Sequence, residues 1–231
     1  MQLLLLSSSK VGDSGYLETA KESLLTHFAN SQDILFVPYA GVTIGWDDYT
    51  KKVQDALPEL NIKGLHQFED VHTALTRADG IMVGGGNTFN LLKTLYDNKL
   101  VAPIRELVSS GMPYAGWSAG SNLAGMSIRT TNDMPIVEPV SFNALNLVPF
   151  QINPHYTDYQ PPGHNGETRD DRLAEFMQAN ADMSVLGIPE GTGIMRQGLK
   201  LSLTGIKPAY LFKNGEKRLV ELSEDLSYLL G

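Results

Sequence analysis

The pentapeptide Gly116-Trp117-Ser118-Ala119-Gly120 constrains the fold of this chain more than any other segment. An apolar stretch, 113–115, precedes it and small residues, 121–124, follow it, which predicts a strand, a sharp turn and a helix with Ser118 at the turn. Such a turn strains its central residue, and glycines on both sides leave room for it. The turn also places Ser118 and Ala119 at a helix N-terminus, where free N–H groups can bind an anion. The segment favours a nucleophilic serine that attacks an acyl bond, and an ordinary turn is the alternative.

Strands and helices alternate through the first half of the chain. Apolar runs predict strands at 2–6, 33–38, 62–66 and 80–83, and periodicity predicts helices at 16–28, 47–56, 69–77, 88–96 and 102–109. Continuous apolar strands that alternate with helices indicate a mainly parallel sheet with both faces covered, which is a three-layer α/β sandwich. Ligands of such sheets bind beyond the carboxyl ends of the strands.

The last part of the chain has a different pattern. Short strands are predicted at 193–196, 199–203, 209–213 and 217–222, with turns at Gln197-Gly198 and Asn214-Gly215. We expect them to form antiparallel strands at one edge of the sheet. Because no segment with the composition of a linker separates these strands from the rest of the chain, we expect a single domain over 1–231.

Composition excludes several classes of protein. The net charge of −8 argues against a nucleic-acid partner. The chain has no cysteine, which excludes a disulfide framework and a cysteine-based zinc site and suits a cytoplasmic protein. No apolar run reaches the length of a membrane span. We therefore expect a cytoplasmic monomer or homodimer that does not bind membranes.

A glycine-rich segment, Gly84-Gly85-Gly86-Asn87, follows the predicted strand 80–83 and precedes a predicted helix. Asn87 is a good N-cap, and the glycines allow backbone N–H groups to converge on an oxyanion. A phosphate site is a competing interpretation. The segment lacks the Lys-Ser/Thr pair of a P-loop, and Phe89 stands where a dinucleotide fingerprint has its third glycine. A tight strand-to-helix turn without a ligand is the simplest alternative.

A nucleophilic serine needs a base, and His155 is our candidate. It follows the apolar run 145–150, which we interpret as a strong strand, so it resembles Ser118 in its position. The remaining histidines lie on predicted helices, at the end of a weak strand or in a Pro/Gly-rich loop; they are His27, His72, His66 and His164.

Three charged residues complete the candidate site. Glu190 follows the apolar run 185–189, and a carboxylate at the end of a buried strand needs a partner, which a catalytic histidine would supply. Asp133 is the alternative acid, although it also suits an Asx turn before Pro135. Arg169 could bind a substrate carboxylate in bidentate fashion, or it could lie at the solvated start of a helix.

Five short motifs occur in a fixed order along the chain: GGGN at 84–87, GWSAG at 116–120, NPH at 153–155, GETR at 166–169 and PEG at 189–191. This order resembles the peptidase E family, aspartyl dipeptidases of the serine type whose flavodoxin-like fold is similar to that of class I glutamine amidotransferases. The resemblance covers nearly the whole chain and implies hydrolysis of dipeptides with N-terminal aspartate, without metal or cofactor. The roles that it implies are nucleophile for Ser118, base for His155, third member for Glu190 or else Asp133, oxyanion N–H groups for Gly86 and Ala119, and substrate-carboxylate binding for Arg169.

Other functions remain open on the sequence. A related peptidase could cleave β-aspartyl bonds, as in cyanophycin breakdown, or the chain could be a small-molecule carboxylesterase. A non-catalytic binding module on the same fold and a nucleotide-binding module that uses Gly84–Gly86 are further alternatives. The class I glutamine amidotransferases that the family resembles have a cysteine at this turn, and Ser118 lacks the thiolate that glutamine-driven amidotransfer requires.

Overall fold

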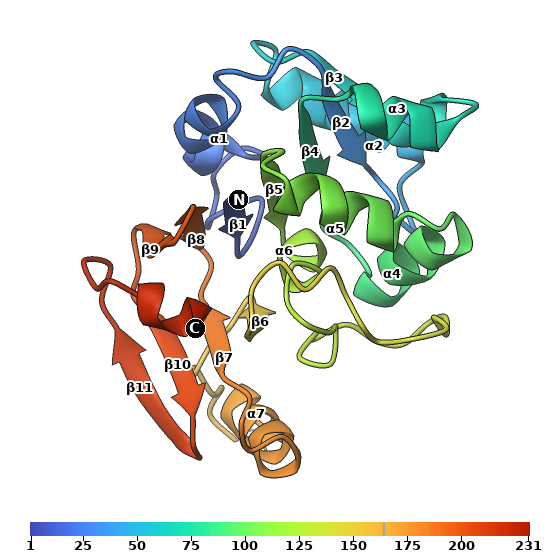
Figure 1. Ribbon diagram of the computed structural model, residues 1–231. Coiled ribbons are helices and arrows are strands. Elements are labelled where there is room, and N and C mark those ends of the chain that lie inside the picture. The colour runs from blue at the N-terminus through green and yellow to red at the C-terminus, as the bar shows by residue number, and fades with distance from the viewer. Residues whose placement is uncertain (164) are drawn as a thin grey trace.

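The computed structural model describes residues 1–163 and 165–231, so His164 lies outside the described residues. Its larger sheet has seven strands in the order β3-β2-β4-β5-β1-β8-β9 (Figure 1). The strands are β1 (Gln2–Leu6), β2 (Ile34–Val37), β3 (Ile62–Gly64), β4 (Gly80–Val83), β5 (Tyr114–Trp117), β8 (Thr192–Gln197) and β9 (Lys200–Gly205). The first five in this order run parallel, and β8 and β9 run antiparallel to their neighbours.

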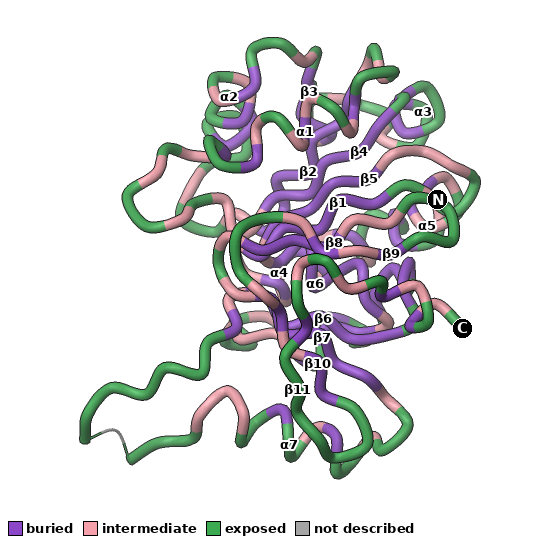
Figure 2. Tube along the Cα trace, turned by 90° about the vertical axis from the view of Figure 1, so that its left-hand side faces the viewer, coloured by how far each residue is buried: buried purple, intermediate pink, exposed green. Residues whose placement is uncertain are grey.

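Side chains alternate between the two faces of this sheet and supply two hydrophobic cores. Leu4, Phe36 and Met82 lie in one core with residues of α1 (Lys21–His27) and α2 (Trp46–Ala56). Leu5 and Ile81 lie in the other core. This second core includes residues of the helices α3 (Val71–Arg77), α4 (Thr88–Asp97) and α5 (Val101–Ser109). Figure 2 shows the central strands buried along most of their length.

A second sheet has four strands in the order β11-β10-β7-β6, and Figure 1 draws it in the lower half with α7 (Arg169–Ala179) beneath. The strands are β6 (Gln151–Pro154), β7 (Val185–Ile188), β10 (Ala209–Lys213) and β11 (Glu216–Val220). On one face, Ile152 and Ile188 join the core that contains α3, α4 and α5. On the other, Val185 and Phe212 pack with residues of α7. The expected α/β fold with a mainly parallel central sheet is confirmed.

The two predicted hairpins do not extend one edge together. β8 and β9 extend the seven-stranded sheet beside β1, whereas β10 pairs with β7 of the second sheet. Burial explains the separation, because Leu211 and Phe212 of β10 point into two different cores. A strand with apolar groups on both faces needs a covered position, and the second sheet provides one.

The apolar run 145–150 is not a strand, although its apolar side chains are buried. Its backbone instead wraps the end of α6 (Ala119–Asn122): the N–H groups of Leu145 and Leu147 donate to the carbonyls of Leu123 and Ala124. Asn146 has a φ of 51°, which breaks extended backbone. The strand before His155 is therefore β6, which starts at Gln151.

In the part of the chain that the structure describes, three short 3₁₀ helices complete the fold: η1 (Glu18–Ala20), η2 (Leu65–Gln67) and η3 (Ser227–Leu230). Two of them shorten predicted elements. The helix predicted over 16–28 begins at Lys21, after η1. The backbone of Leu17 is in the left-handed conformation, with a φ of 57°, which a right-handed helix does not allow. The strand predicted over 62–66 ends at Gly64, where η2 begins.

Candidate active site

Ser118 lies in the sharp turn between β5 and α6, with φ 53° and ψ −113°. This is the strained backbone that the sequence predicts. The chain comes very close to itself here. A Cβ at Gly116 would lie 2.5 Å from the carbonyl oxygen of Gly120, and one at Gly120 would lie 2.2 Å from that of Val83. Larger residues would therefore force the turn open and displace the Ser118 hydroxyl.

His155 and Glu190 follow the paired strands β6 and β7 of the second sheet. The strands run parallel with Pro154 opposite Ile188, so the residues after them emerge side by side. Nδ1 of His155 lies 2.8 Å from Oε1 of Glu190, and Nε2 lies 3.0 Å from Oγ of Ser118. The structure thus joins three of the residues that the sequence singled out, from two different sheets.

The hydrogen bonds of His155 define its chemistry. A carboxylate only accepts, so Nδ1–H donates to Glu190, and Nε2 is left to accept from the Ser118 hydroxyl. This tautomer suits a base that removes the serine proton. The side chain of Glu190 is half-exposed, at 50%. The sequence led us to expect that burial makes the Glu190 carboxylate require a partner. Because the side chain is half-exposed, that reason does not hold.

Ser7 is a residue of the site that the sequence analysis missed. It follows β1 and is fully buried. Its hydroxyl donates to the carbonyl of Ile188 at 2.7 Å and accepts from the backbone N–H of His155 at 2.9 Å. His155 has a positive φ of 52°, an uncommon conformation that this bond helps to hold. A signal was present, because Ser7 is the first polar residue after a buried strand.

Asn122 makes a second link between the two sheets. It lies in α6, and its Nδ2 donates to the carbonyl of Ile152 in β6 at 2.7 Å. Thr130 donates to the same carbonyl at 2.8 Å, and Asn132 donates to that of Pro154 at 2.7 Å. These side chains satisfy carbonyls of β6, which has a neighbouring strand on one side only. They tie the helix that begins after Ser118 to the strand that ends before His155.

Asp133 lies at the N-terminus of α4. Its Oδ2 accepts from the backbone N–H of Thr88 at 2.7 Å and from the Thr88 hydroxyl at 2.6 Å, and the Thr131 hydroxyl lies 3.2 Å away. A carboxylate at this position satisfies a free helical N–H and complements the helix dipole. The carboxylate on His155 is that of Glu190.

The glycine-rich segment lies directly against Ser118. A Cβ at Gly85 would be 2.9 Å from Cβ of Ser118. Gly86 has a φ of 136°, and a Cβ there would lie 2.2 Å from the carbonyl oxygen of Ala40, so only glycine fits. Within the described residues, the N–H groups of Gly86 and Ala119 donate no hydrogen bond. Both remain available to a developing oxyanion.

Arg169 is the first residue of α7 and lies outside the cleft of Ser118. It lines a neighbouring pocket of about 280 Å³ together with Asn132 and Tyr159. Burial and the charge of Arg172 lower the pKa of the Arg169 guanidinium, and the carboxylate of Asp133 opposes them.

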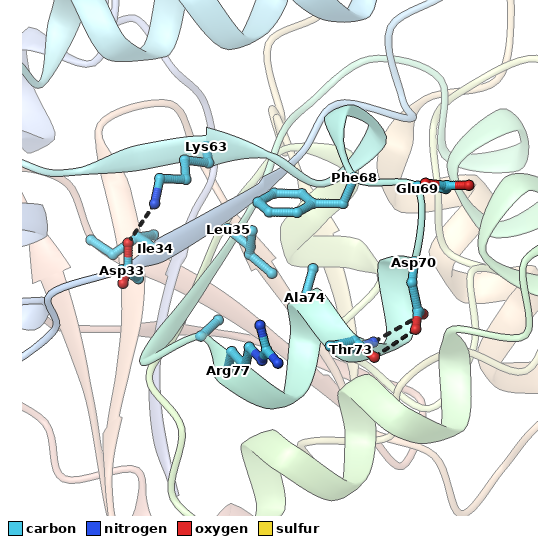
Figure 3. A pocket seen from close by; sticks show the side chains of 11 residues that line it. Asp33, Ile34, Leu35, Lys63, Phe68, Glu69, Asp70, Thr73, Ala74 and Arg77 are labelled. Atoms are coloured by element: carbon cyan, nitrogen blue, oxygen red, sulfur yellow. Dashed lines mark hydrogen bonds and ion pairs between the residues drawn. The ribbon is translucent and has the colours of Figure 1, made fainter.

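The cleft that contains Ser118 has a volume of about 730 Å³. His155, Glu190 and Gly86 line it, together with Tyr16 and Lys52. A separate cavity of about 420 Å³ lies beside α3, with Leu35, Phe68 and Arg77 in its lining (Figure 3). That cavity contains none of the residues that the sequence singled out. In the described part of the chain, no group of three His, Asp or Glu residues is placed to hold a metal ion.

Comparison with known sequences gives one consistent result. Residues 3–204 match the model of peptidase family S51. The chain is 55% identical to a peptidase E of Shewanella baltica (strain OS155) over 230 residues, which cover 98% of this chain and 97% of the relative. It is 53% identical to a peptidase E of Shewanella amazonensis, over 100% of this chain and 99% of the relative.

Two solved structures share the fold. A candidate peptidase E from Listeria monocytogenes EGD-e is 25% identical, with a TM-score of 0.65 over 89% of this chain and 98% of its own. A peptidase from an acI-B1 Actinobacterium is 18% identical, with a TM-score of 0.69 over 97% and 96%. Among the described residues, no helix combines the length and hydropathy needed to cross a bilayer.

Proposed function

The chain belongs to peptidase family S51, and from that premise we propose that it is a serine dipeptidase that hydrolyses dipeptides with N-terminal aspartate. Similarity to peptidase E proteins over the full chain supports a serine peptidase that acts on dipeptides. The observation that carries the proposal is the hydrogen-bonded chain from Ser118 through His155 to Glu190, at 3.0 and 2.8 Å.

In the proposed acylation step, Oγ of Ser118 attacks the carbonyl carbon of the aspartyl residue. His155 accepts the serine proton at Nε2, and Glu190 stabilises the imidazolium through Nδ1–H. The C–N bond then breaks, and His155 donates the proton to the leaving amine. Water attacks the acyl-enzyme in the second step, with His155 again as base, and aspartate is released.

We assign oxyanion stabilisation to the N–H groups of Gly86 and Ala119. They come from the glycine-rich loop and from the start of α6, and both lack an acceptor among the described residues. Loss of one such donor typically costs about 3–4 kcal/mol of transition-state stabilisation. A Gly86→Ala substitution would displace the loop, since the added Cβ would overlap the Ala40 carbonyl.

Arg169 is our candidate for binding the aspartyl side chain. Guanidinium pairs with carboxylate in bidentate geometry, and the net charge of −8 means that an acidic substrate needs a local cation. Arg169 lines the pocket next to the Ser118 cleft, and Asn132 links that pocket to the backbone before His155.

We also expect a cytoplasmic location, because a chain without cysteine does not depend on an oxidising compartment.

A panel of X-Leu dipeptides with all twenty residues at X tests the proposal. The wild-type enzyme should release aspartate selectively, and Arg169→Met should lose most of its preference for Asp-Leu over Ala-Leu. β-Asp-Leu and a neutral p-nitrophenyl ester in the same panel test the two hydrolase alternatives. Efficient turnover of either one without hydrolysis of Asp-Leu would contradict the proposal.

A further inference from the structure

Two lysines line the cleft of Ser118 and have no role in the reaction described so far. They are Lys10, in the segment after β1, and Lys52, in α2. Among the described residues, no carboxylate lies within ion-pair distance of either ammonium group. Both ammonium groups therefore add positive charge to the same cleft, in a protein that has more acidic than basic residues.

The Lys52 ammonium, in the lining of this cleft, lies over an aromatic ring. It lies 4.3 Å from the centre of the Tyr16 ring, within the range of a cation–π contact. The Tyr16 ring in turn packs edge-on against Trp117, with 6.3 Å between ring centres. Trp117 directly precedes Ser118, so this stack connects the ammonium group to the turn that carries the nucleophile.

Lys10 approaches the cleft from the side of His155. It is three residues from Ser7, whose hydroxyl accepts the backbone N–H of His155. The Ser8 hydroxyl donates to the carbonyl of Lys10 at 2.6 Å and closes a tight turn in this segment. His155 must reach the leaving nitrogen of the substrate, so this segment flanks the half of the substrate that departs.

An aspartyl dipeptide carries a negative charge on each side of the bond to be cleaved. One is the aspartyl side chain, and the other is the free carboxylate of the second residue. That carboxylate lies within about 7 Å of the scissile carbonyl, because extended residues span about 3.5 Å each. Arg169 lines a different pocket from Ser118, which leaves Lys10 and Lys52 as the lysine or arginine cations in the described lining of the Ser118 cleft itself.

We propose that Lys10 and Lys52 bind the free C-terminal carboxylate of the dipeptide and so restrict the enzyme to substrates with one residue after the cleaved bond. The inference rests on the proposed function. Lysine suits this task because its ammonium is a point charge on a flexible stem, which tolerates the shift in carboxylate position as the second side chain changes.

The test compares Asp-Leu with Asp-Leu amide, which differ only in the charge at the C-terminus. The readout is the ratio of the two kcat/KM values. In the double variant Lys10→Met/Lys52→Met this ratio should fall about tenfold, as for loss of a charge-assisted contact. Lys52→Arg should keep most of the ratio. Lys51→Met is the matched control on the same helix, because Lys51 is exposed and pairs with Asp55 at 2.9 Å.

The outcomes separate the two claims. An unchanged ratio in an active double variant would overturn the lysine assignment and leave the proposed function standing. An equal fall for both substrates would also overturn it, because the lysines would then act on the shared aspartyl part. A wild-type enzyme that cleaves neither substrate would contradict the proposed function itself.

Discussion

At the scale of single residues, the position of His155 depends on a hydroxyl that has no access to substrate. Ser7 joins the end of β1 to His155 and to the carbonyl of Ile188. Because β1 is also the neighbour of β5, the same strand supports Ser118 through the bond from its N–H to the Leu6 carbonyl at 3.1 Å. Ser118 and His155 are thus both hydrogen-bonded to residues at the end of one strand.

Ser7→Ala should lower kcat about tenfold with little change in KM, because the imidazole loses a contact that fixes its backbone but the cleft is unchanged. It should also lower the free energy of unfolding by about 1–3 kcal/mol, since buried partners lose a hydrogen bond. Steady-state kinetics and urea denaturation measure the two effects. Thr50→Val is the control, because Thr50 is a buried hydroxyl away from the cleft. A wild-type kcat in the Ser7→Ala enzyme would show that Ser7 does not position His155.

Glu190→Gln and Asp133→Asn distinguish the two candidate acids. Glu190→Gln should lower kcat by roughly 10² or more, because the amide no longer fixes the tautomer of His155 or stabilises its charge. Asp133→Asn should keep kcat within about tenfold and lower stability by about 1 kcal/mol, as expected for a carboxylate at a helix N-terminus. A larger kcat loss for Asp133→Asn would reassign the acid.

At the scale of elements, the local sequence pattern predicts strands correctly where they are apolar and bounded by glycine. The strand predicted over 80–83 is β4, and the turn at Ser118 follows β5 as expected. The pattern failed for 145–150, where burial comes from wrapping α6 and not from strand pairing. A run of apolar residues indicates that the side chains are buried, but it does not indicate which part of the chain accepts the backbone hydrogen bonds.

His27 provides a pH-dependent contribution to stability through α1. Its Nε2–H donates to the Tyr114 carbonyl of β5 at 3.0 Å, and burial lowers its pKa to about 4 from 6.5. The unfolded chain therefore binds this proton at higher pH than the folded chain. The free energy of unfolding should fall as pH drops from about 6.5 to 4, by up to about 1.4 kcal/mol per pH unit.

Urea denaturation at several pH values measures this slope, and His27→Gln is the comparison because its side chain does not titrate. The difference in unfolding free energy between the two proteins should shrink as pH falls through this window. A constant difference from pH 7 to pH 4 would exclude the titration of His27 as its cause.

At the scale of the whole molecule, the two sheets share one hydrophobic core. Leu5 and Ile81 of the larger sheet and Ile152 and Ile188 of the smaller belong to the same cluster. The sequence predicts most strands of this arrangement, but it misplaces β6 at 145–150 and does not predict the division into two sheets. The contacts that decide the division are distant in sequence, such as that between Ser7 and Ile188, which are 181 residues apart. Within the candidate site, the residues around Ser118 are enough to predict its turn. The contacts of Asp133 and Ser7 involve residues distant in the sequence and could not be predicted in this way.

A shared core predicts one cooperative unfolding transition for the chain, in line with a single domain. Far-ultraviolet circular dichroism, tryptophan fluorescence and hydrolysis of Asp-Leu should be lost at the same urea concentration. Loss of activity well before the other signals would indicate that the smaller sheet, with His155 and Glu190, separates first.

In the proposed mechanism, Ser118 forms a covalent intermediate. The most direct measurement mixes the enzyme rapidly with an aspartyl p-nitrophenyl ester, follows p-nitrophenolate, and maps the acid-quenched protein by mass spectrometry. We expect a burst of about one product per enzyme and an aspartyl group on the peptide that contains Ser118, both absent in Ser118→Ala. An aspartyl group on another residue, or turnover by Ser118→Ala at the wild-type rate, would show that Ser118 is not the nucleophile.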